Sequence, residues 1–114
     1  MAVANVNGLL SPLADAKIPI SDRGFLYGDS IYEVVIVENG VPMFLEDHFD
    51  RMKKSAAKIE LEITQTNKKI KCEISKTLKF LIEKTKNECN EIYVRWLKMI
   101  FFKCYARNCQ LLNN

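Results

Sequence analysis

The sequence lacks any run of apolar residues long enough to cross a membrane, since such a helix needs about 18 or more in succession. Its N-terminus also has no basic region followed by an apolar run of the kind that directs secretion. One histidine leaves few candidate zinc ligands, and the cysteines show no paired CxxC spacing. We therefore expect a soluble, cytoplasmic protein with reduced thiols, no metal site and no membrane association. The cysteines are Cys72, Cys89, Cys104 and Cys109.

A strong charge of either sign is also missing. The chain has 17 basic and 14 acidic residues, which gives a formal charge of +3. Its most basic stretch, Lys68 to Lys86, contains Glu73 and Glu83, and its only aromatic residue is Phe80. Proteins that bind single-stranded nucleic acid alternate positively charged residues with aromatic side chains on which the bases stack. We therefore expect no nucleic-acid partner and interpret this stretch as a solvated helix face.

The 114 residues, 48% of them hydrophobic, are enough for one domain with a single core. Two Asn-Gly pairs predict two β-hairpins. Asn7-Gly8 interrupts the apolar segment Val3 to Leu10, and Asn39-Gly40 separates Ser30 to Val37 from Val41 to Phe44. Between the hairpins, Ser11 to Ser21 holds two prolines and is expected to form a surface loop.

After the second hairpin the apolar period becomes helical. Apolar residues recur at spacings of three or four along two segments, and the second is expected to begin after Thr66-Asn67 and to end near Asn87. The first face comprises Leu45, Phe49, Met52, Ala56 and Ile59, and the second comprises Ile70, Ile74, Leu78, Leu81 and Ile82.

The β-rich segment Ile92 to Phe102 predicts a strand that returns to the sheet. Residues 103–114 show neither periodicity nor turn signals, so we expect an irregular tail there and a domain over residues 1–102. The fold class is α+β, a small antiparallel sheet of hairpins packed with two helices.

A segment with two glycines and three charges among aromatics, Asp22 to Asp29, precedes the second hairpin. Such residues suit a shaped loop that presents side chains or backbone amides to a ligand. The alternative is an ordinary turn with Asp22 and Arg23 paired at the surface.

Together with this loop, Ser21 to Gly40, Leu45 to Leu61 and Ile92 to Trp96 resemble the start of class IV pyridoxal-phosphate enzymes. The family includes branched-chain aminotransferases, D-amino-acid aminotransferases and aminodeoxychorismate lyases, and the order and spacing of the segments also match. The resemblance implies pyridoxal 5'-phosphate as cofactor, an amino acid and a 2-oxo acid as substrates, and a homodimer.

Arg51 is the residue that the resemblance assigns to the cofactor, because the family's H-x-x-R pair, here His48 and Arg51, supplies an arginine to the phosphate. A guanidinium suits this role because its fork of donors matches phosphate oxygens and its charge is permanent. From composition alone, an ion pair of Arg51 with Asp47 or Glu46 on the same helix is the alternative. His48 is interpreted as supporting the surroundings of Arg51.

Tyr32, Tyr93 and Arg95 are the substrate-binding residues that the resemblance implies. Tyr32 follows the glycine loop as in D-amino-acid aminotransferases, although packing within the sheet explains a tyrosine there equally well. Tyr93 and Arg95 share one face of a strand, like a substrate-side pair in branched-chain aminotransferases. Alternation places Glu33 on the face opposite Tyr32, and we interpret Glu33 as structural.

The resemblance fails after Trp96. Family members continue into a Thr-Arg-Gly segment and a larger domain whose lysine binds the cofactor covalently, whereas residues 97–114 show neither. We therefore expect an aminotransferase-like fragment that is inactive by itself and has no catalytic residue of its own. The alternatives are a non-catalytic remnant or interaction domain, or a relative of the lyases.

Overall fold

The two Asn-Gly pairs form the turns of two hairpins. The computed structural model describes residues 2–88, 98–104 and 109–113, with side chains described as far as residue 84. The first hairpin joins β1 (Val3–Val6) to β2 (Leu9–Pro12), and the second joins β3 (Ile31–Glu38) to β4 (Val41–Pro42). All four turn residues have positive φ, as the tightest hairpin turns require. Both predicted hairpins are confirmed.

The connection between the hairpins is more ordered than the sequence indicated. β2 extends through Ser11 and Pro12, and a 3-10 turn, η1 (Leu13–Asp15), follows it. The segment predicted as a shaped loop contains a short helix, α1 (Arg23–Tyr27). Its first turn is capped by the Asp22 carboxylate, which accepts a hydrogen bond of 2.8 Å from the Phe25 amide. The loop prediction is therefore wrong for these five helical residues.

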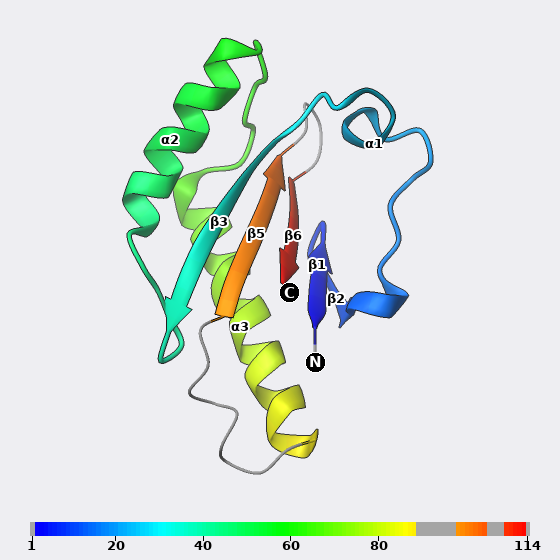
Figure 1. Ribbon diagram of the computed structural model, residues 1–114, viewed down its shortest axis with the longest axis vertical. Helices are drawn as coiled ribbons and strands as arrows, with labels where there is room; N and C mark the ends of the chain where they lie inside the picture. The colour runs from blue at the N-terminus through cyan, green and yellow to red at the C-terminus, as the bar shows by residue number, and fades with distance from the viewer. Residues whose placement is uncertain (1, 89–97, 105–108, 114) are drawn as a thin grey trace.

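The predicted irregular tail is also wrong, because it contributes to two strands in the middle of the sheet. β5 (Lys98–Cys104) and β6 (Cys109–Asn113) pair with each other, β5 pairs with β3, and β6 pairs with β1. Across the described residues the strand order is β2-β1-β6-β5-β3-β4, and every pairing is antiparallel. Within the sheet, β6 and β5 therefore lie between the two N-terminal hairpins (Figure 1).

Both predicted helices are confirmed as α2 (Leu45–Lys58) and α3 (Asn67–Glu88). They bury the apolar faces that the spacing indicated, with two exceptions: Ile59 lies beyond the end of α2 and is 45% exposed, and Ile82 is only partly buried. No helix in the described part of the chain combines the length and apolar character of a membrane span. The main core cluster consists of Val35, Val37, Leu45, Phe49, Met52, Ile70, Ile74 and Leu78.

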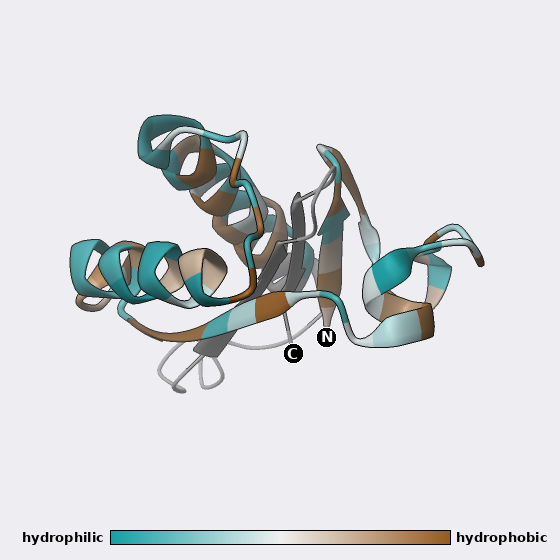
Figure 2. Ribbon diagram, turned by 90° about the horizontal axis from the view of Figure 1, so that it is seen from above, coloured by the Kyte–Doolittle hydropathy of each residue, from teal (hydrophilic) through white to brown (hydrophobic). Residues whose placement is uncertain are grey.

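The helices α2 and α3 lie on the same side of the sheet (Figure 2). Along β3, alternation turns Glu33, Val35 and Val37 toward this side, where all three are buried. The other face of β3 carries Tyr32 and Ile36, which are 67% and 44% exposed. The α+β class and its antiparallel sheet are thus confirmed, with one face of β3 under helices and the other open.

Candidate functional site

Glu33 is a buried carboxylate on the helix-covered face of β3. Only 4% of its surface is exposed, and it occupies the same row as the core residues Val35 and Val37. A buried charge is costly unless it is paired and hydrogen-bonded. Its partners therefore decide what this position does.

Arg51, from the second turn of α2, is one partner. Its Nε donates to Glu33 Oε1 at 2.9 Å and to Oε2 at 3.1 Å, and its Nη2 donates to Oε2 as well. The alternative pairing within the helix is not found: Glu46 binds Lys71 of α3 at 2.7 Å, and no ion pair joins Asp47 to Arg51 among the described side chains. The Arg51 side chain remains 64% exposed, so its guanidinium is anchored at one edge and open at the other.

His48 is the second partner of Glu33. Its Nδ1 lies 2.7 Å from Glu33 Oε2 and 3.4 Å from Nη2 of Arg51. The spacing of three residues between His48 and Arg51 places both side chains on one face of α2, directly above β3. One carboxylate thus holds both residues of the H-x-x-R pair.

The contacts of Glu33 also favour its ionised form. Burial by itself would raise the pKa of this carboxyl, but the hydrogen bonds from Arg51 and His48 and their charges outweigh burial. The net effect lowers the pKa of Glu33 below its ordinary value, while the Glu33 carboxylate raises the pKa of Arg51. Glu33 is therefore a carboxylate, and an acceptor only, at neutral pH.

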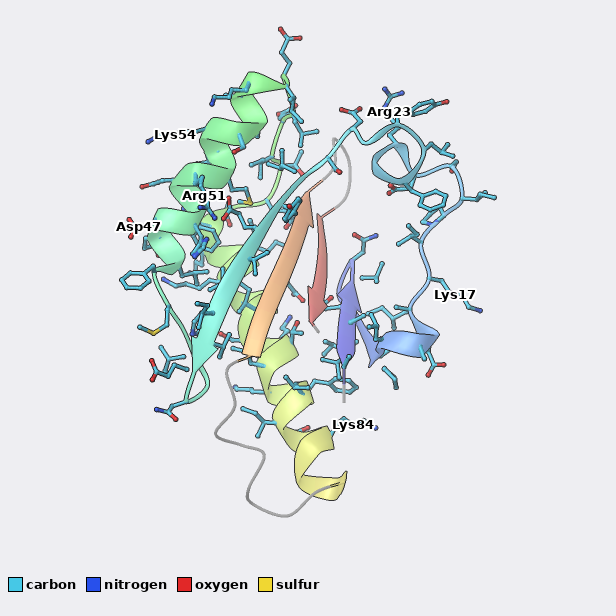
Figure 3. The ribbon with its side chains drawn as sticks, viewed as in Figure 1. Lys17, Arg23, Asp47, Arg51, Lys54 and Lys84 are labelled. Carbon is cyan, nitrogen blue, oxygen red and sulfur yellow. The ribbon has the colours of Figure 1, made fainter. Side chains whose placement is uncertain are left out.

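A surface depression of about 230 Å³ is lined by Asp47, His48 and Arg51. Asp47 and Arg51 project from α2 one turn apart (Figure 3). The depression therefore combines an arginine anchored from below, a histidine fixed through one nitrogen, and one exposed carboxylate. The guanidinium is permanently charged, and the donors at its open edge can bind an anion.

Tyr32 is not among the residues that line this depression. Tyr32 lies next to Glu33 on β3 but on the opposite face of the strand, where it is largely exposed. Tyr93 and Arg95 lie outside the described residues. Arg23 pairs with Asp29 at 2.9 Å at the surface rather than with its neighbour Asp22, which caps α1.

Glu33 is the site residue whose importance sequence reasoning missed. The available signal was an acid within a β-rich segment, on the same face of the strand as Val35 and Val37. Such a position predicts a buried charge with a partner, and the H-x-x-R pair lies 15 and 18 residues further along the chain.

Residues 30–98 match the family model described as Amino-transferase class IV. The chain belongs to the class IV aminotransferase family. The matched range includes Glu33, His48 and Arg51.

Curated relatives of this class IV chain include D-alanine aminotransferases. The protein from Listeria monocytogenes serotype 4b is 39% identical over 71 residues, which are 62% of this chain and 25% of that protein. The protein from Staphylococcus aureus strain N315 is 30% identical over 90 residues, 79% of this chain and 30% of the relative. The chain thus spans between a quarter and a third of the length of these relatives.

Solved structures of the family share the fold. A fold IV transaminase from Curtobacterium pusillum has a TM-score of 0.80 at 17% identity and matches 99% of this chain and 42% of its own. A putative branched-chain amino acid aminotransferase from Thermotoga maritima has a TM-score of 0.71 at 15% identity, with 99% and 37% covered. A branched-chain amino acid aminotransferase from T.th., solved with pyridoxamine 5'-phosphate, has a TM-score of 0.64 at 18% identity, with 97% and 38% covered.

Proposed function

We propose that Arg51, together with Glu33 and His48, supplies the phosphate-binding part of a pyridoxal-phosphate site for amino-group transfer between an amino acid and a 2-oxo acid. The supporting observation is the state of Arg51, whose guanidinium is anchored by buried Glu33 and open toward the depression. An arginine fixed in this way offers its remaining donors in one orientation, which suits a phosphate group.

The depression fits the phosphate of the cofactor rather than the whole molecule. Its volume of about 230 Å³ is below the range of roughly 300–1,000 Å³ that small-molecule sites occupy. Arg51 would hold the phosphate there, and the rest of the cofactor would need residues beyond those that line the depression. When bound, pyridoxal phosphate supplies the electron sink for amino-group transfer.

Tyr32, Tyr93 and Arg95 are proposed to orient the substrate. An arginine with a tyrosine hydroxyl can bind the carboxylate of an amino acid and so limit its orientations. The Tyr-Glu pair at Tyr32 favours a D-amino acid, as do the D-alanine aminotransferases among the relatives. The Tyr-x-Arg pattern at Tyr93 favours a branched-chain substrate, so both remain candidates.

We further propose that these 114 residues do not catalyse the transfer by themselves. In the described part of the chain no lysine lines the depression, although Lys53, Lys54 and Lys58 lie on the same helix. All three are exposed and are interpreted as solvated surface residues.

The test of the phosphate role uses pyridoxine 5'-phosphate, which has no aldehyde and so cannot react with lysines. We expect Arg51→Met to weaken its binding, followed by NMR of the α2 amides, by about tenfold or more, because charge-assisted hydrogen bonds to the phosphate are lost. Lys54→Met is the matched control, since it removes an exposed cation from the same helix (Figure 3), and should leave binding within about twofold. Equal binding by the native chain and Arg51→Met would refute the proposal.

The catalytic part is tested separately. Pyridoxal phosphate is added to the native chain, the mixture is reduced with borohydride, and modified lysines are located by mass spectrometry. We expect scattered labelling of surface lysines and no amino-group transfer. A stoichiometric adduct at one lysine would show that the chain contains its own reactive lysine.

A further inference from the structure

The contacts of His48 specify which of its ring nitrogens carries hydrogen. Nδ1 lies 2.7 Å from Glu33 Oε2, and Glu33 is a carboxylate that can only accept. A hydrogen bond at this distance therefore requires hydrogen on Nδ1. It follows that neutral His48 is the tautomer with a bare Nε2.

His48 also lines the depression, and its side chain is 18% exposed. Because Nδ1 is engaged by Glu33, Nε2 is the ring nitrogen left for a ligand there. In the neutral ring Nε2 is an acceptor and repels an anion's oxygen, whereas in the protonated ring it is a donor. Protonation of His48 therefore changes what the depression offers to an anion without moving a side chain.

The charges around His48 determine how strongly its protonation affects the binding of an anion. β3 contributes Glu33, and α2 contributes Asp47 and Arg51. Glu33 balances the charge of Arg51, so Asp47 leaves the group with one net negative charge while His48 is neutral. Glu46, in the same helix turn as Asp47, is engaged by Lys71 of α3. Protonation of His48 is what brings this group of four residues, Glu33 included, to neutrality.

We propose that His48 is a second anion-binding residue of this site, that it acts through protonated Nε2 beside Arg51, and that Glu33 is the positioning residue that orients it. This inference rests on the proposed phosphate role of Arg51 and adds to it a dependence on pH. The site binds a doubly charged oxyanion, such as a phosphate monoester, more tightly at acidic pH, even though Arg51 keeps its charge throughout.

Sulfate is the probe that tests this inference, because its charge does not change over the pH range in which histidines titrate. Binding is measured on the native chain at about pH 5.5 and about pH 8, which bracket the usual histidine range. Chemical shifts of the His48 ring follow the titration, and His48 is the only histidine in the chain. We expect sulfate affinity to be about tenfold higher at the acidic pH, the usual size of a charge-assisted hydrogen bond.

Three variants separate the roles, with binding followed through the α2 amides. His48→Gln should bind equally at both pH values. Glu33→Gln removes a negative charge, which would strengthen anion binding if charge were its only role; we expect weaker binding at the acidic pH, because neither His48 nor the anchored edge of Arg51 is held as in the native chain. Asp47→Asn is the matched control: it removes a charge from the same lining and should strengthen binding at both pH values while the pH ratio persists.

The outcomes distinguish this inference from the proposed function. If Arg51→Met abolishes sulfate binding but His48→Gln keeps the native pH ratio, the role of His48 is refuted and that of Arg51 stands. Tighter binding by folded Glu33→Gln refutes the positioning role. If Arg51→Met binds like the native chain, or the native chain does not bind at the acidic pH, both proposals fail. The His48→Gln comparison remains decisive even if Glu33→Gln does not fold.

Discussion

Glu33 packs in the core of this chain and also positions two residues of the candidate site. It is a buried acid in a row of core residues, and two basic side chains of α2 offset the cost of its burial. The same contacts fix the anchored edge of Arg51 and the hydrogen-bearing nitrogen of His48. A single carboxylate therefore ties the sheet to the helix and positions the two basic residues that are proposed to bind an anion.

This pairing predicts a specific dependence of stability on pH. Because the pKa of Glu33 is lowered in the folded chain, its stabilisation is present above its ordinary pKa of 4.5 and disappears as the pH falls through the lower folded value. We expect Glu33→Gln to reduce the free energy of unfolding at pH 7, with the difference from the native chain shrinking below about pH 4.5. Urea unfolding at several pH values measures both.

Glu38→Gln is the control for this prediction, because Glu38 is an exposed acid on the same strand. Its unfolding free energy should stay close to the native value at neutral pH. A gap between Glu33→Gln and the native chain that is the same at pH 7 and well below pH 4.5 would show that ionisation of Glu33 is not the source of its stabilisation.

The residues of the H-x-x-R pair could be found from sequence, but their shared partner could not. His48 and Arg51 are three apart on one helix, and helical geometry alone brings them together. Glu33 is 15 and 18 residues away in the chain, and only the packing of α2 on β3 shows that it meets both. The competing partners, Asp47 and Glu46, were closer in sequence and equally reasonable on charge.

At the scale of elements, a buried polar link ties the first hairpin to α3. Asn5 on β1 is 1% exposed, and its Nδ2 donates to Glu73 Oε2 at 2.9 Å and to Thr77 Oγ1 at 3.1 Å. Its Oδ1 accepts from the Gly8 amide at 2.8 Å and so supports the hairpin turn. The side chain thus joins a turn, a strand and a helix that are distant in sequence.

We expect Asn5→Ala to lower the free energy of unfolding by about 1–3 kcal/mol, because the Gly8 amide loses its acceptor and the buried Thr77 hydroxyl keeps only its bond to the Glu73 carbonyl. Thr77→Ser is the comparison, since it retains the hydroxyl that Asn5 contacts and should cost less. Chemical denaturation of both variants at neutral pH checks the order. A loss for Asn5→Ala no larger than that for Thr77→Ser would contradict the importance of this link.

Some helices and strands could be predicted from the sequence more readily than others. Helical spacing identified α2 and α3, and Asn-Gly turns identified both hairpins, because these signals are local. β6 has no such local signal. It pairs with β5, which is close in the chain, and with β1, whose residues lie about a hundred positions away. Residues without a pattern of their own form a strand there because neighbours on both sides satisfy their backbone groups.

At the scale of the whole molecule, the open face of β3 is the counterpart of the helix-covered face. Alternation turns Tyr32 and Ile36 to this face, and Figure 2 shows α2 and α3 on the opposite side. Exposed apolar side chains on one face of a strand are a feature of protein contact surfaces. This observation supports the alternative in which the chain acts through an interaction surface, in addition to any role in a cofactor site.

The open face leads us to expect self-association that grows with protein concentration. Ile36→Thr should reduce it, because the substitution removes apolar area from the exposed face while keeping a residue suited to a strand. Ile59→Thr is a matched control, since Ile59 is 45% exposed against 44% for Ile36 but lies at the end of α2. Sedimentation velocity over a range of concentrations should give a lower average mass for Ile36→Thr than for Ile59→Thr. A native chain that stays monomeric throughout, or equal masses for the two variants, would show that this face does not drive association.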